Sequence, residues 1–217
     1  MKRTWMLPFL LILTMLLAGC AAKTERTGFL TPYPDFSPGP KGGADLRYLK
    51  PDADFSKYNK IMLDHVIFYP TKDSALQGLE ADKLKELADD FHEAMIKELQ
   101  DTYPLVAEPG PDVVRLRVAI TDVEFAKPVL NTVSTVMPIG LALSIVKKGV
   151  TGEGTGVGSA SMEMEALDSM TNSRVAAAID KHAGDKLHAF TRTGSAKEAF
   201  RFWAKRVRMF LDEAHGK

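Results

Sequence analysis

The residues best suited to metal chemistry lie near the exit of a predicted hairpin. They are Asp180, His182, Asp185 and His188. None of the five histidines of the chain pairs with another at the i, i+4 spacing by which a helix offers two metal ligands. The motif H-E-x-x-H is also missing. We therefore interpret this cluster as a solvated, charged loop and predict neither a metal ion nor another cofactor.

A run of glycines, GEGTGVG at 152–158, raises the question of phosphate binding. The spacing differs from G-x-G-x-x-G, because Val157 stands where the third glycine belongs. A strand rather than a helix is predicted after the run, so no helix N-terminus would face a phosphate. We interpret the run as a flexible hinge.

The sequence contains no recognisable set of residues for nucleophilic catalysis. No serine lies in G-x-S-x-G. Asp64 and His65 are adjacent on a predicted strand, so their side chains point to opposite faces and cannot form a dyad. We therefore predict that the protein is not an enzyme, and keep an envelope enzyme as the least favoured hypothesis.

The composition narrows the class of protein further. The chain has 217 residues, of which 45% are hydrophobic, enough for a folded core. Its 28 basic and 28 acidic residues give no net charge, which argues against a nucleic-acid partner. The single cysteine excludes an internal disulfide framework.

That cysteine, Cys20, ends the N-terminal sequence MKRTWMLPFLLILTMLLAGC. Lys2 and Arg3 precede an apolar run that is too short to span a membrane but typical of an export signal. Leu17-Ala18-Gly19-Cys20 resembles the lipobox of bacterial lipoproteins. The resemblance implies a signal peptide at 1–19, acyl chains such as palmitate on Cys20, and a membrane as partner. The alternative is an ordinary signal peptide with an incidental cysteine.

The sorting rule of Gram-negative lipoproteins concerns the residue that follows the lipidated cysteine. Ala21 stands there instead of aspartate. The resemblance therefore implies an outer-membrane anchor with the domain facing the periplasm.

Residues 20–57 are predicted to be a lipidated tether and a Pro/Gly-rich linker, because this composition suits neither a regular helix nor a central strand. A plain spacer is the favoured interpretation. The alternative is a segment laid along the domain through its apolar residues, which are Phe29, Leu30, Tyr33 and Phe36.

Residues 58–217 are predicted to form one globular domain. Hydrophobic periodicity indicates a strand at 60–69 buried on both faces, a helix at 81–102 and a strand at 113–125. A hairpin at 158–182 follows, with turn residues at 168–173, and a capping box at Ser195–Glu198 opens a last helix. The fold class is α/β (α+β), with a mixed or mostly antiparallel sheet of about four strands, two main helices on one face, and the order β-α-β-β-β-α.

Charged residues alternate with apolar ones on two of these strands. Arg115 and Arg117 point away from the predicted core, as do Glu163 and Glu165. We predict that the two arginines face the two glutamates across neighbouring antiparallel strands.

Two further surfaces are candidates for contacts. Arg201, Lys205 and Arg208 share one face of the last helix, where they either bind anionic lipid or wall polymer or are simply solvated. Residues 129–146 contain no charged residue, which is unusual for a loop in a compact domain. This segment either packs on the domain, dips into the membrane or mediates self-association, and its candidate contact residues are Val136, Met137, Ile139, Leu141, Leu143 and Ile145.

Several segments together resemble one family. They are the lipobox, YNKIMLDHVIFYP, EPGPDVVRLRVAITDVEF, VGSASMEMEALDSMTNSRVAAAIDKHAG and FRFWAKRVRMFLDEA. In this order they resemble the bacterial lipoproteins of domain-of-unknown-function family 3313. The resemblance implies an envelope lipoprotein and no catalytic residue.

The favoured hypothesis is a non-enzymatic lipoprotein, anchored in the outer membrane, that serves as an interaction or assembly module of the cell envelope. Its partner would be another envelope protein or a second copy of the chain. The alternative is a ligand- or cell-wall-binding lipoprotein.

Overall fold

The computed structural model describes residues 26–125, 158–184 and 193–217. Within these ranges the chain forms one mixed sheet of seven strands, two α-helices and one short 3₁₀ helix. The elements follow in the order β1 (Ser37–Pro38), β2 (Leu46–Leu49), β3 (Lys60–Leu63), β4 (Ile67–Phe68), η2 (Ala75–Gly78), α2 (Ala81–Leu99), β5 (Val113–Glu124), β6 (Ser159–Asp168), β7 (Arg174–Ala183) and α4 (Gly194–Ala214).

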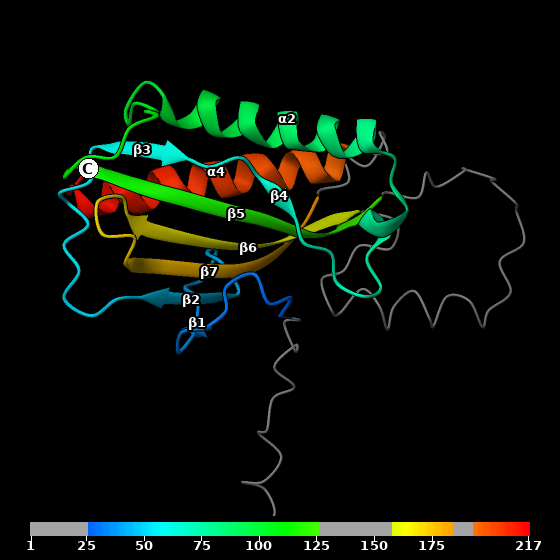
Figure 1. Ribbon diagram of the computed structural model, residues 1–217, viewed down its shortest axis with the longest axis horizontal. Coiled ribbons are helices and arrows are strands. Elements are labelled where there is room, and N and C mark those ends of the chain that lie inside the picture. Colours follow the sequence, from blue (N-terminus) through cyan, green and yellow to red (C-terminus); the bar gives the residue numbers. More distant parts are fainter. Residues whose placement is uncertain (1–25, 126–157, 185–192) are drawn as a thin grey trace, which may run out of the picture.

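The strands lie in the spatial order β1-β2-β7-β6-β5-β3, with β4 also paired to β5. Both helices cover the same face of the sheet and pack against each other (Figure 1). We call this the inner face, and the opposite one the outer face. The predicted α+β class and the two helices on one face are confirmed, but the sheet has more strands than the predicted four.

The main core lies between the helices and the inner face. Helix α2 contributes Leu87, Phe91 and Met95, which recur at helical spacing. Helix α4 contributes Phe200 and Trp203. Alternate residues of β5 and β6 complete this core, because side chains of a strand point to opposite faces in turn.

The predicted helices and hairpin are confirmed, and the first helix begins at Ala81 as predicted but ends earlier, at Leu99. The turn between β6 and β7 contains Asn172 at φ 55°, the left-handed conformation expected there. The predicted capping box is wrong. Helix α4 begins at Gly194, its N-cap Thr193 makes no side-chain cap hydrogen bond, and Ser195 is buried inside the first turn.

The predicted single strand at 60–69 is wrong in two respects. It is divided into β3 and β4, and both pair in parallel with β5 at one edge of the sheet. Of the four residues of β3 only Ile61 is buried, so the strand is not covered on both faces. An apolar run alone does not distinguish a central strand from an edge strand.

Residues 26–57 do not form a plain spacer. They add β1 and β2 to the sheet, where β2 pairs antiparallel with β7. The preceding residues lie on the outer face as the alternative interpretation predicted, and Leu30 is fully buried in a second, small core with Ala177 and Ile179. We call residues 26–36 the strap.

Neither α-helix in the described ranges is long and apolar enough to cross a membrane. Cys20 and the apolar segment 129–146 lie outside the described residues. Its candidate contact residues, Val136, Met137, Ile139, Leu141, Leu143 and Ile145, therefore stay predictions.

Candidate functional site on the outer face

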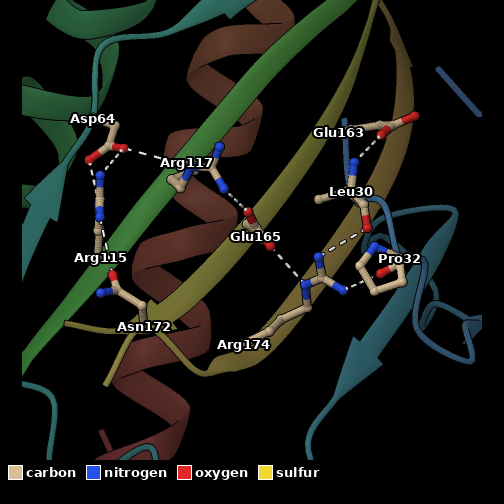
Figure 2. A network of polar contacts seen from close by, with 9 residues as sticks. All are labelled: Leu30, Pro32, Asp64, Arg115, Arg117, Glu163, Glu165, Asn172 and Arg174. Atoms are coloured by element: carbon tan, nitrogen blue, oxygen red, sulfur yellow. Dashed lines mark hydrogen bonds and ion pairs between the residues drawn. The ribbon is translucent and has the colours of Figure 1, made fainter. Parts of the chain in front are cut away.

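A network of charged side chains crosses the outer face of the sheet (Figure 2). Arg115 and Arg117 come from β5, Glu163 and Glu165 from β6, and Arg174 from the start of β7. They reach this face because the apolar residues between them point to the core on the inner face. The sheet thus positions five charged side chains on a rigid surface.

Glu165 lies at the centre of this network. Its side chain is only 3% exposed, and each of its two carboxylate oxygens forms an ion pair with one arginine. Arg117 Nη1 donates to Oε1, and Arg174 Nε donates to Oε2 at 2.7 Å. A buried carboxylate needs such partners, because an uncompensated buried charge is strongly destabilising.

Arg115 pairs with Asp64 rather than with a glutamate. Its Nε and Nη2 donate to the two oxygens of Asp64, both at 2.9 Å. This bidentate bond raises the pKa of Arg115. Nη1 donates to Asn172 Oδ1 at 3.1 Å, so Arg115 joins the chain after β3 to the β6–β7 turn.

The predicted pairing of two arginines with two glutamates is therefore half correct. Strands β5 and β6 are antiparallel neighbours, and Arg117 lies opposite Glu165. The register then places Arg115 opposite Leu167 and Ala119 opposite Glu163. Alternation along each strand identifies the face but leaves the register undetermined, which is why the second pair is wrong.

Glu163 holds the strap. Its side chain is fully buried, with 0% exposed. Oε1 accepts hydrogen bonds from Thr27 N at 2.7 Å and Thr27 Oγ1 at 3.0 Å, and Oε2 accepts one from Leu30 N at 3.2 Å. The Tyr33 hydroxyl lies 2.9 Å from both oxygens. Burial, together with the Glu163 carboxylate, raises the pKa of Tyr33, so the phenol stays a donor.

Arg174 holds the same strap through backbone carbonyl groups. Its Nη1 donates to the carbonyl oxygen of Pro32 at 2.6 Å, and its Nη2 donates to that of Leu30 at 3.0 Å. The guanidinium of Arg117 lies over the ring of Phe29, 5.2 Å from its centre. The network therefore continues from the sheet into the strap (Figure 2).

Between the strap and the β6–β7 turn the outer face forms a polar recess of about 510 Å³. Three arginines and two carboxylates line it, so the recess has a small positive charge and rigidly held N–H donors. Such a surface suits hydrogen bonding to a polar partner group. Sequence reasoning missed three of its residues, Asp64, Asn172 and Arg174, since their roles depend on contacts between distant segments.

The predicted basic face of α4 is only partly available. Arg201 and Lys205 are exposed. Arg208 Nη1 instead lies 3.3 Å from the carbonyl oxygen of Glu98, and its Nε lies 3.5 Å from an oxygen of Asp212. The structure thus brings two of the three cations to the surface and ties the third to neighbouring groups.

The residues considered for metal binding near the hairpin exit have other contacts. Asp180 is buried and accepts a hydrogen bond from Trp203 Nε1 at 2.7 Å. His182 stacks on Phe202, with ring centres 3.9 Å apart. Asp185 and His188 lie outside the described residues. In the part of the chain that the structure describes, no group of three His, Cys, Asp or Glu side chains is placed to hold a metal ion.

The family model described as "Protein of unknown function (DUF3313)" matches residues 25–207. The chain belongs to this family. The match begins at the strap and ends within α4, so it covers the outer-face network of this DUF3313 chain.

One relative of this DUF3313 chain is a protein of Escherichia coli (strain K12) named "Uncharacterized lipoprotein YdcL". It is 29% identical over 179 residues, which are 79% of this chain and 79% of that protein. A protein of the same name from Escherichia coli O157:H7 matches equally well.

Solved structures give weaker likenesses to this DUF3313 chain. A single-substitution variant of the PelC dodecamer from Paraburkholderia phytofirmans matches with a TM-score of 0.40 and 9% identity, over 74% of this chain and 93% of that one. The PelC dodecamer from the same organism, in another crystal form, gives a TM-score of 0.39 and 10% identity, over 74% and 95%. Scores this low carry no argument about function.

Proposed function

We propose that this protein is a lipoprotein, anchored in the outer membrane through acyl chains on Cys20, whose domain faces the periplasm and serves as a non-enzymatic interaction or assembly module. The lipobox-like residues and the name of the E. coli relative support the lipoprotein part of the proposal. Ala21 supports outer-membrane sorting by the resemblance given above.

The observation that carries this proposal is the attachment of the strap to the sheet. The strap is the first described segment after Cys20, and the buried Glu163 binds it through Thr27 and Leu30. A free spacer would need no buried carboxylate, and a buried charge is costly unless it is fully hydrogen-bonded. The outer face thus holds the chain segment that follows the proposed anchor, which supports a domain kept close to the membrane.

Membrane separation tests the anchor. We would express the full chain and the Cys20→Ser variant in a Gram-negative host and separate inner from outer membranes on a density gradient. The native chain is expected in the outer membrane, and the variant is expected to leave it. Protease should cut the domain only after the outer membrane is permeabilised. A Cys20→Ser chain that stays in the outer membrane contradicts the proposal.

Site-specific photo-crosslinking tests the interaction module. A photoreactive amino acid at Asn172, which lines the polar recess, is expected to give a defined adduct in living cells. The same group at Glu93, exposed on α2, is the matched control. Labelling that is equal at both positions, or missing from the recess, contradicts the role proposed for this surface.

The alternative function, a ligand-binding lipoprotein, is favoured by a different observation. An apolar groove lies on the inner face beside α4.

A further inference from the structure

The groove lies between α4 and the paired strands β2 and β7, on the helix side of the sheet. Its floor contains three half-buried alanines, Ala166, Ala176 and Ala178. Short side chains at these positions leave a gap under the helix, where larger residues would fill the core. The cavity measures about 140 Å³.

The walls of the groove are apolar. Helix α4 contributes half-buried Phe202, Val207 and Phe210. Leu49 and Phe55 also line the groove, and the Phe55 ring packs edge-to-face on that of Phe210, with centres 5.0 Å apart. An apolar cavity of about 150 Å³ stays dry and binds benzene. The groove therefore has room for an apolar group of about six carbon atoms.

Two cations complete the groove. Arg47 lies opposite Ala178 in the β2–β7 register, and Arg206 comes from α4. Among the described residues neither guanidinium forms an ion pair with a carboxylate, although every arginine of the outer-face recess does. The carboxylate of Asp180 also lines the groove, but it already accepts hydrogen bonds from Trp203 Nε1 and, at 2.9 Å, from Asp45 N.

We propose that this groove binds a free single-chain amphiphile with an anionic head group, of the fatty-acid class. The tail occupies the cavity over the three alanines, and the head group is held by Arg47 and Arg206. Arg206 Nη1 donates only a weak hydrogen bond, to Met209 Sδ at 3.9 Å. Two guanidiniums that have no carboxylate partner among the described residues fit this ligand, because they offer charge-assisted hydrogen bonds to an anionic head group. The inference does not depend on the anchor or on the outer-face partner.

Photolabelling tests the site directly. The full-length chain, in nanodiscs of zwitterionic lipid, would be labelled with an octanoate that carries a diazirine at its terminal carbon. We expect the label on the wall residues Phe202, Val207 and Phe210. Unlabelled octanoate should compete at least tenfold better than octylammonium, because the two differ in head-group charge.

Variants separate the two parts of the site. Ala178→Leu fills the cavity and should lower labelling at least tenfold, and Ala176→Val is a second filling variant with a side chain that strands favour. The double variant with Arg47→Gln and Arg206→Gln should lose the preference for octanoate over octylammonium as the competitor of labelling. Lys97→Gln, which removes an exposed cation from α2, is the control and should change neither.

Three outcomes would overturn the proposal. The first is label outside the groove, or label that neither filling variant lowers. The second is competition by octylammonium as strong as that by octanoate, or competition only by vesicles of phosphatidylglycerol, which would indicate a lipid-surface contact. The third is a protomer–protomer crosslink through α4 that Ala178→Leu abolishes, which would make the groove an interface between copies.

Discussion

Replacing Glu163 by glutamine is expected to release the strap while the domain stays folded. The native carboxylate accepts hydrogen bonds from Thr27, Leu30 and Tyr33 in a fully buried position. Hydrogen bonds to a charged group contribute about 1.5–3 kcal/mol and neutral ones about 0.5–1.5 kcal/mol. Glutamine is nearly isosteric, but its amide NH₂ turns a donor toward one of the two backbone N–H groups, of Thr27 or Leu30.

The loss combines weaker bonds to the remaining oxygen with one buried backbone donor left unpaired. Together these amount to about 2–4 kcal/mol of strap attachment. Since about 1.4 kcal/mol is a factor of ten, the opening equilibrium of the strap should rise about 30- to 700-fold. The main core should be unaffected, because it lies on the inner face of the sheet.

Hydrogen exchange measures this change residue by residue. The amide of Leu30 should exchange faster by the same factor in Glu163→Gln, whereas amides of β5 should keep their protection. Glu93→Gln makes the same chemical change on the exposed surface of α2 and is the control. Unchanged exchange at Leu30 would refute the role assigned to Glu163, and an equal rise across the whole sheet would refute a strap that opens locally.

Three further predictions concern stability, measured by urea unfolding. Arg117→Met and Arg174→Met should each lower the unfolding free energy by about 1–3 kcal/mol. Because both arginines bind Glu165, the loss in the double variant should differ from the sum of the two single losses by at least about 0.5 kcal/mol. Strict additivity would contradict a shared partner. Gly184→Ala should cost about 1–3 kcal/mol, since a Cβ there would lie 2.6 Å from Ser195 Cβ, whereas Gly78→Ala, with nothing within 4 Å, is the control and should cost less. Hydrogen bonds from Lys57, Thr171 and Tyr58 lower the pKa of Asp168. The stability that the Asp168 carboxylate contributes is therefore complete above the unfolded pKa of about 3.9 and is lost as the pH falls further. The difference in unfolding free energy between the native and Asp168→Asn chains should shrink below about pH 4, and a constant difference from pH 7 to pH 2 would contradict this.

Local patterns in the sequence predicted much of the fold. Helices α2 and α4 follow from apolar residues at helical spacing, and the β6–β7 hairpin follows from alternation around the turn that contains Asn172. These signals lie within one element or between neighbours in sequence, where short-range physics decides the outcome.

Contacts between distant segments were not predictable in the same way. Strand β2 lies in a Pro/Gly-rich stretch, and it is a strand because β7, far along the chain, supplies its partner. The prediction of a capping box at Ser195 was wrong for a similar reason. Ser195 lies within the first turn of α4, where it is buried close to Gly184, instead of preceding the helix. In the outer-face network the sequence identified the face of Arg117 and Glu165, but not the strap that Glu163 binds.

The attachment of Thr27 to Glu163 also limits the distance between the domain and the proposed anchor at Cys20. With Cys20 as the proposed anchor, the first fixed point is Thr27, seven residue steps further along the chain, and seven steps reach at most about 25 Å. Releasing the strap as far as β1, which begins at Ser37, would lengthen this tether to 17 residue steps from Cys20, or about 60 Å. For a domain anchored at Cys20 as proposed, the strap would confine it to a thin layer above the lipid, where its effective concentration is high for membrane-bound partners and negligible for distant ones.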